Sequence, residues 1–338
     1  MADPPAPSSL RARLVKFGQR PIRFKRRHML LALLGAAAAA GVFAVRRDLH
    51  LRNTIALRIW IPTGFDHEGG LVRSRAAAEA IRPLFPRKRA PGPGDWLAVV
   101  DEPGQTFNDY LRAFTPATRE AAGAILVLPF GDFDARLTRI LADVVELLGL
   151  FYGRAVQLLP AEAVPALPAD QRRGKGPSEQ LYTMPLLDLL KKRVPADAAA
   201  LLAMTPMDLT PGPGWNFVFG QATLADRVGL WSLYRVADAG APPERQLRRT
   251  AGVALHELGH MFGIWHCTAY ECCMNGSNTM SETDACPLAF CPECDAKIIW
   301  RFHLDPAPRY RRLAAFVKAR GLARDAETWT KCAEALGR

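Results

Sequence analysis

One stretch of the chain limits its fold and its chemistry more than any other, HELGHMFGIWH from His256 to His266. On a helix, residues four apart lie roughly 40° from each other around the axis, so His256 and His260 face the same way and can share one metal ion. Gly263 is the residue type that lets a helix end in a left-handed turn, and such a turn brings His266 back toward the same ion. Apolar residues at helical spacing predict a helix over roughly 245–262. The motif, which has the form HExxHxxGxxH, predicts a reversal of the chain directly after it.

Three imidazole ligands predict a catalytic rather than a structural zinc site, because they leave one coordination position for water. Zinc lowers the pKa of such a water to about 7 and polarises a substrate carbonyl. Glu257 follows the first ligand directly, so its carboxylate can take the proton of the water and pass it to a leaving amine. Bare HExxH also arises as two surface histidines beside a solvated glutamate, but that explanation does not account for Gly263 and His266. We expect peptide-bond hydrolysis, with His256, His260 and His266 as zinc ligands and Glu257 as the general base.

Six of the seven cysteines follow the histidine motif directly, within residues 267–294. Two close cysteine pairs separated by a loop are typical of tetrahedral zinc sites, whereas disulfide frameworks usually spread their cysteines. The pairs CxxxxC and CxxC predict a second, structural zinc ion, with Cys267, Cys272, Cys291 and Cys294 as its ligands. Cys273 and Cys286 compete for a ligand position, and disulfides in an oxidising compartment are the competing interpretation. Because Cys267 follows His266, the second of these two zinc ions would fix the backbone that carries a ligand of the first.

Upstream of the motif, short apolar runs alternate with amphipathic stretches, as in βαβ units. This pattern predicts an α/β (α+β) chain with five strands and three helices. The strands are expected at 124–130, 155–160, 199–209, 216–222 and 228–236, and the helices at 135–151, 181–192 and 245–262. A short turn joins the last two strands, so one of them is expected to be antiparallel and to lie at an edge of the sheet.

Composition shifts divide the chain into four expected parts. These are a basic leader with an apolar segment (1–47), a loosely attached N-terminal extension (48–121), a subdomain with the active-site helix (122–266), and a C-terminal subdomain with the structural zinc and terminal helices (267–338). Within the extension, alternation predicts a strand at 54–62, and the Pro/Gly-rich run 89–94 interrupts regular structure.

The leader carries an uncharged run of 17 residues, 29–45, which reads MLLALLGAAAAAGVFAV. It is short for a spanning helix but suits the apolar region of a signal peptide, and small residues at 42–44 suit cleavage after Ala44. Arg26 and Arg27 just before it resemble a twin-arginine export signal. The competing interpretations are an uncleaved membrane anchor and an amphipathic or buried helix. We expect export to the periplasm or membrane anchoring through 29–45, and a cytoplasmic protein if the leader is not a targeting signal.

The net charge of +11 is concentrated in the leader. Ten of the 44 Lys/Arg residues but only one of the 33 Asp/Glu residues lie within 1–47, which leaves 34 basic against 32 acidic residues in the rest of the chain. A nearly neutral body lacks the basic surface that phosphate binding needs. We therefore expect no nucleic-acid partner.

The residues around the motif resemble one known family. HELGHMFGIWHC is followed by the CxxxxC pair, by Met274 and by CPEC, and upstream lie WNFVFGQATLADRVGLWSL (215–233) and, more weakly, EPGQTF (102–107). Over roughly 94–310 the chain resembles the archaemetzincins, a family of metzincin-type zinc metallopeptidases. The resemblance implies a twisted, mixed, metzincin-like sheet over the active-site helix, a four-cysteine zinc site, and a methionine turn at Met274, with Met280 as the fallback. Family members are small, mostly soluble metallopeptidases, some described as aminopeptidases, so the leader departs from the family pattern.

The expected partner is a peptide or protein substrate, laid antiparallel along strand 216–222 or its neighbour 228–236. Asp208, Asp226 and Glu282 are candidate anchors for a substrate amine, and the sequence leaves open whether the enzyme is an aminopeptidase or an endopeptidase. The alternative from another class is a zinc-stabilised peptide-binding module at the membrane with little or no hydrolysis. Glu257 argues against it, because a pure binding site has no use for a base beside the metal. We expect a monomer.

Overall fold

The computed structural model describes residues 67–113 and 123–337. The chain separates into two compact units, 1–65 and 66–338, and the described residues all belong to the second. The leader and the strand expected at 54–62 lie outside the described residues. Between residues 67 and 337, the described helices include none that is long and apolar enough to cross a membrane.

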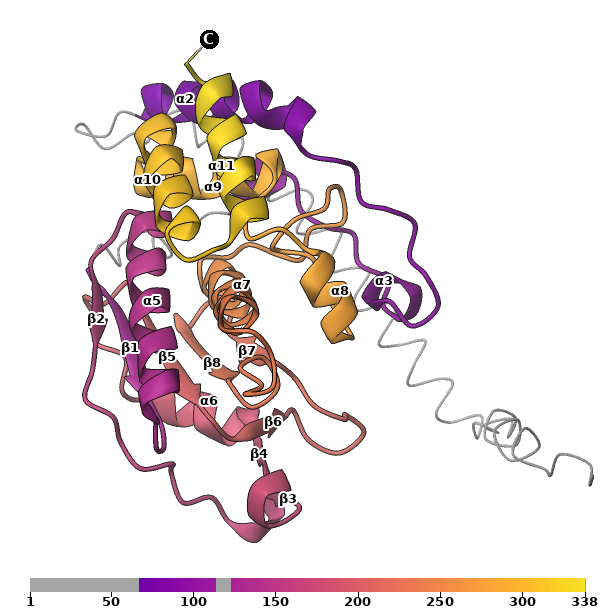
Figure 1. Ribbon diagram of the computed structural model, residues 1–338, viewed down its shortest axis with the longest axis vertical. Helices are drawn as coiled ribbons and strands as arrows, with labels where there is room; N and C mark the ends of the chain where they lie inside the picture. The colour runs from indigo at the N-terminus through magenta and orange to yellow at the C-terminus, as the bar shows by residue number, and fades with distance from the viewer. Residues whose placement is uncertain (1–66, 114–122, 338) are drawn as a thin grey trace, which may run out of the picture. The chain divides into compact units, whose positions relative to one another are not determined.

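The central feature is a mixed five-stranded sheet with the strand order β2-β1-β5-β8-β7 (Figure 1). Its strands are β1 (Ile125–Pro129), β2 (Val156–Leu158), β5 (Ala200–Thr205), β7 (Gly220–Ala222) and β8 (Val228–Ser232). β1, β2, β5 and β8 are parallel, and β7 runs antiparallel to β8, with Gly220 opposite Trp231. The mixed sheet and the antiparallel edge strand are therefore confirmed, and each of the five expected segments contributes a strand to this sheet, although several strands are shorter than expected.

A second, three-stranded sheet was missed by the sequence analysis. It consists of β3 (Arg172–Arg173), β4 (Gln180–Tyr182) and β6 (Asp208–Thr210), in the order β3-β4-β6. The single strand expected at 199–209 is wrong, because the chain forms β5, breaks, and then forms β6. Pro206 lies in the break, and proline has no backbone N–H to donate to a sheet ladder. Likewise, the helix expected at 181–192 begins later, as α6 (Thr183–Lys191), because β4 takes the residues before it.

Helices cover both faces of the main sheet. Successive residues of a strand point to opposite sides, so each face of the sheet packs its own set of side chains against helices. α5 (Ala135–Tyr152) and α7 (Pro243–Met261) pack against each other on one face, and α6 contacts β8 on the other (Figure 1). The strand residues that share a core cluster with α5 and α7 are Ile125, Val127, Ala200, Leu202, Met204 and Trp231. Those that share a cluster with α6 are Leu128, Leu201, Ala203, Val228 and Leu230.

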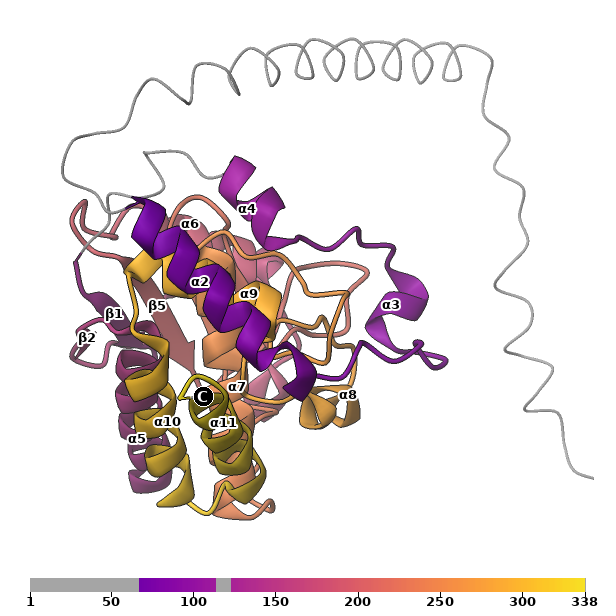
Figure 2. The same cartoon turned by 90° about the horizontal axis from the view of Figure 1, so that it is seen from above.

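The remaining helices come from the two ends of the described chain. They are α2 (His67–Ile81), α3 (Trp96–Val99), α4 (Phe107–Ala113), α8 (Met280–Ala285), α9 (Pro292–Phe302), α10 (Pro306–Lys318) and α11 (Ala323–Ala335). Short 3₁₀ helices follow α2, as η1 (Arg82–Leu84), and lie between β2 and β4, as η3 (Ala169–Gln171) and η4 (Gly176–Ser178). α2 lies across α9 (Figure 2), and α4 also packs against α9. Ala77, Phe107 and Tyr110 are buried in the same core cluster as α5 and α7. The described part of the N-terminal extension is thus built into the core, which corrects the expectation of a loose attachment.

Candidate active site

The histidine motif has the geometry that its spacing predicts. α7 carries His256 and His260 in its last two turns, and the chain reverses at Gly263, whose φ is +81°. The ligand nitrogens of His256, His260 and His266 all lie within 4.8 Å of one another, and the Nε2 atoms of His256 and His260 are 3.0 Å apart. At the usual Zn–N distance of about 2.1 Å, tetrahedral ligand atoms are about 3.4 Å apart. The three imidazoles therefore fit a single zinc ion.

The second nitrogen of each imidazole ring is held by an acceptor. His256 Nδ1 lies 2.8 Å from the carbonyl oxygen of Cys273, and His260 Nδ1 lies 2.7 Å from that of Ile264. His266 Nδ1 lies 2.8 Å from the carboxylate of Glu102. With each Nδ1–H donated in this way, the lone pair of each Nε2 is free to bind a metal.

The electrostatics of the helix favour neutral imidazoles. Burial, with the nearby His266 adding to it, lowers the pKa of His256 to about 3. Burial and the two neighbouring histidines also hold the pKa of His260 well below its usual value of 6.5. Neutral imidazole is the form that binds a metal ion, so the two ring nitrogens are ready to do so near neutral pH without first losing a proton.

Glu257 lies beside the histidines and lines the same cleft. The cleft has a volume of about 760 Å³ and runs between β7 with the preceding loop, α7, and the loop that leads into and out of α8. The Glu257 side chain is largely buried, and this burial raises the pKa of its carboxyl group to about 8. A Cβ atom at Gly220 would lie only 2.7 Å from Glu257 Oε1, so β7 can pass this close to the carboxylate only because residue 220 is glycine.

None of the three candidate amine anchors lines the cleft. Asp208 accepts hydrogen bonds from Arg235 and Gln180. Asp226 forms an ion pair with Lys191, and Glu282 accepts the backbone N–H groups of Trp96 and Asn278. Each carboxylate has a structural partner far away in the sequence, so the expectation that they bind a substrate amine is wrong for all three.

Met274, the residue expected to form the methionine turn, packs against the active-site helix α7. It is fully buried, and its carbonyl oxygen accepts the N–H of Cys267 at 2.7 Å. A Cβ atom at Gly259 would lie 2.5 Å from Met274 Sδ, so the thioether packs directly against the backbone of α7 between the two helical histidines. Met280 begins α8 instead.

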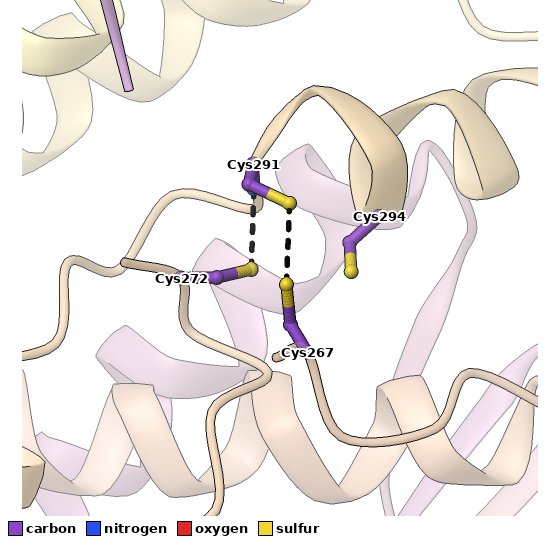
Figure 3. Close-up of side chains that lie close together, drawn as sticks. All are labelled: Cys267, Cys272, Cys291 and Cys294. Carbon is purple, nitrogen blue, oxygen red and sulfur yellow. Dashed lines mark hydrogen bonds between the residues drawn. The ribbon is translucent and has the colours of Figure 1, made fainter. Parts of the chain in front are cut away.

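The four cysteines expected to bind zinc gather at one point, with their sulfur atoms turned toward a common centre (Figure 3). The sulfurs of Cys267, Cys272, Cys291 and Cys294 lie within 4.8 Å of one another, and all four residues are buried. Cys267 Sγ and Cys291 Sγ are 3.6 Å apart, close to the roughly 3.8 Å that Zn–S bonds of about 2.3 Å give at tetrahedral geometry. Burial raises the pKa of the Cys272 and Cys291 thiols, so thiolates persist there only beside a cation. The donor set therefore fits a zinc ion.

The two rival cysteines lie outside this group. Cys273 Sγ is 3.4 Å from the carbonyl oxygen of Gly252, and Cys286 Sγ is 3.4 Å from that of Glu282. Both residues line the active-site cleft. All seven cysteines are free thiols, so no disulfide joins them.

Glu102 is the site residue that the sequence analysis missed. It lies 164 positions before His266, outside the histidine and cysteine motifs. The only sequence signal was the resemblance of EPGQTF, which begins at Glu102, and that resemblance assigned it no role.

Comparison with known proteins finds relatives of this chain. Residues 186–299 match the model of Peptidase family M54. Archaemetzincin-2 of Homo sapiens is 30% identical over 285 residues, which cover 72% of this chain and 78% of the relative. The archaemetzincin of Pyrococcus furiosus is 29% identical over 178 residues, covering 52% of this chain and 91% of the relative. A crystal structure of an archaemetzincin from Methanopyrus kandleri is 28% identical, covers 55% of this chain and 98% of its own, and superimposes with a TM-score of 0.46.

The fold, the convergent histidines and these relatives define a zinc metallopeptidase, whose substrates are peptides or proteins. More narrowly, the chain belongs to the archaemetzincin family.

Proposed function

We propose that the chain hydrolyses peptide bonds with a zinc ion held by His256, His260 and His266 and with Glu257 as the general base. The observation that carries this assignment is the convergence of three ring nitrogens beside a carboxyl group in one cleft. Each of the three rings has its other nitrogen engaged, so the metal-binding face of each is fixed.

Glu257 moves the proton in this proposal. Zinc, when bound, would supply polarisation of the scissile carbonyl and acidification of water. The Glu257 carboxylate accepts a proton from the attacking water and later donates it to the amine that leaves. Burial raises the pKa of this carboxyl group, so its ionised form is a stronger proton acceptor than a carboxylate in open water. The positive charge of a bound zinc ion would favour that ionised form near neutral pH.

The edge strand β7 is the proposed docking line for the substrate backbone. β7 pairs with β8 on one side only, and no described strand pairs with its other side. Gly220, Gln221 and Ala222 are half-buried and line the cleft. An extended peptide can add to such an edge through main-chain hydrogen bonds, which would bring its carbonyl groups past Glu257.

A second zinc ion is proposed at Cys267, Cys272, Cys291 and Cys294, which gives two ions per chain. Four protein ligands leave no position for water, so this ion is structural. Cys267 and His266 are neighbours, so the cysteine site holds the backbone that places the third histidine.

A library of peptides tests the proposed hydrolysis. We expect the purified chain to cleave members of the library, to stop when a chelator removes zinc, and to recover when zinc is added back. Including peptides with blocked amino termini separates an endopeptidase, which cuts them, from an aminopeptidase, which does not. Zinc-loaded protein that binds peptides without cutting any of them would refute the proposal and favour the membrane-associated binding module.

The leader and the assembly state are proposed from the sequence alone. We propose that residues 29–45 direct export or anchor the chain at a membrane, with cytoplasmic residence as the outcome if the segment does not act as a signal, and that the chain is a monomer. A native mass measurement on protein from membrane and soluble fractions reports cleavage and subunit number together. Finding only the full-length chain in the soluble cytoplasm would contradict the first proposal, and a dimer mass the second.

A further inference from the structure

We propose that Glu102 is a positioning residue that fixes the ring of His266 for metal binding. The inference rests on the proposed role of His266 as the third zinc ligand. It assigns a function to the N-terminal extension, which contributes no residue to the HExxHxxGxxH motif.

The three histidines differ in how their Nδ1 atoms are held. The acceptors for His256 and His260 are backbone carbonyl oxygens, and both histidines are built into a long helix. His266 lies beyond the helix, and its Nδ1 meets a carboxylate, with Glu102 Oε1 at 2.8 Å and Oε2 at 2.9 Å. His266 is thus the one histidine of the three that no helix holds in place, and it is also the one whose Nδ1 faces a charged side chain.

The environment of this pair favours a strong interaction. The side chains of His266 and Glu102 are only 19% and 23% exposed. The ring of Trp96 packs edge-on against the His266 ring, with 5.2 Å between centroids. A carboxylate that accepts the Nδ1–H in such a place restricts the rotation of the imidazole, fixes its tautomer and makes its Nε2 more basic.

The segment that carries Glu102 is itself tied to the reversal after α7. Gln105 Nε2 donates to the carbonyl oxygen of Gly263 at 3.2 Å, and its Oε1 accepts the N–H of Trp265 at 3.3 Å. One side chain thus holds the turn from both ends, three residues along from the carboxylate that holds His266.

Helix α9 anchors the same segment from the other side. The buried Lys297 donates to the carbonyl oxygen of Gln105 at 2.6 Å, and Glu293 accepts the N–H of Phe107 at 2.8 Å. α9 also carries Cys294, one of the four gathered cysteines. The position of Glu102 is therefore set by the cysteine-bearing part of the fold and not by the extension alone.

The test measures zinc affinity at the histidine site, separately from activity. Glu102→Ala removes the acceptor, and Glu102→Gln keeps an acceptor oxygen but removes the charge. Loss of such a partner typically weakens metal binding by about 10–100-fold. We expect Glu102→Ala to fall in this range in a competition with a chromogenic chelator, Glu102→Gln to fall between it and the wild type, and Asp101→Asn, an exposed neighbour, to match the wild type.

Cobalt substitution separates positioning from general damage to the fold. The thiolate-to-cobalt charge-transfer band reports the cysteine site, and we expect it to be unchanged in both Glu102 variants. Wild-type zinc affinity at the histidine site of Glu102→Ala would overturn the proposal, and so would an equal weakening of both sites. These outcomes are independent of turnover, so a wild-type chain that cleaves no peptide would refute the proposed function without touching the role of Glu102.

Discussion

Glu257→Gln is expected to lose most turnover while it keeps its zinc. The amide has nearly the same shape as the carboxyl group but cannot accept the proton of water. Positioned general bases typically contribute about 10²–10⁴-fold to the rate, so kcat should fall by a factor in that range. Because the three histidines are unchanged, zinc content measured on the same sample should match the wild type.

The same change elsewhere on the helix provides a matched control. Glu244 lies in the first turn of α7 and is exposed, so Glu244→Gln alters the charge of the helix without reaching the cleft. We expect its kcat to equal that of the wild type. Turnover retained in Glu257→Gln would show that Glu257 is not the general base. Zinc lost from that variant would mean that Glu257 supports the metal site instead.

The parts of the fold that the sequence predicted are those with a long periodic signal. α5 and α7 have apolar residues at helical spacing, and β5 is a continuous apolar run that is buried on both faces. The three-stranded sheet was not predicted, because most residues of β4 were assigned to the helix expected at 181–192 and most of those of β6 to the strand expected at 199–209, while β3 has only two residues. The pairing of β4 with β6 also joins segments that are far apart in the sequence, and the pattern of residues within one short segment does not predict such a contact.

The site divides in the same way. The convergence of the three histidines and of the four cysteines was predictable, because the residues of each group lie close together in the sequence, where helix geometry and pair spacing relate them. The suggested amine anchors were wrong because their partners are distant, as Arg235 is for Asp208. Glu102 was missed for the same reason, since its partner His266 is 164 residues away.

Cys294→Ser is expected to unfold the C-terminal part of the chain and to remove the structural zinc. Zinc bound to thiolates contributes on the order of 10 kcal/mol to the folding of small sites, whereas a whole domain is stable by only about 5–15 kcal/mol. The remaining sulfurs, Cys267, Cys272 and Cys291, are buried and would be left without a cation to hold their charge. Thermal unfolding should shift to much lower temperature, and zinc content should fall from two ions per chain to one or fewer.

Cys286→Ser distinguishes this effect from the loss of any thiol in the region. Cys286 is only partly buried, and its sulfur contacts a helix carbonyl oxygen rather than the four gathered cysteines. We expect this variant to keep two zinc ions and a melting temperature close to that of the wild type. The reverse result, with zinc lost from Cys286→Ser and kept by Cys294→Ser, would identify Cys286 and not Cys294 as the fourth zinc ligand. Helix α9 carries Cys294 as well as Lys297 and Glu293, which bind the backbone of the segment that follows Glu102. We therefore expect the Cys294→Ser variant also to bind zinc less tightly at the histidines. Native mass spectrometry of partly loaded protein can measure this affinity.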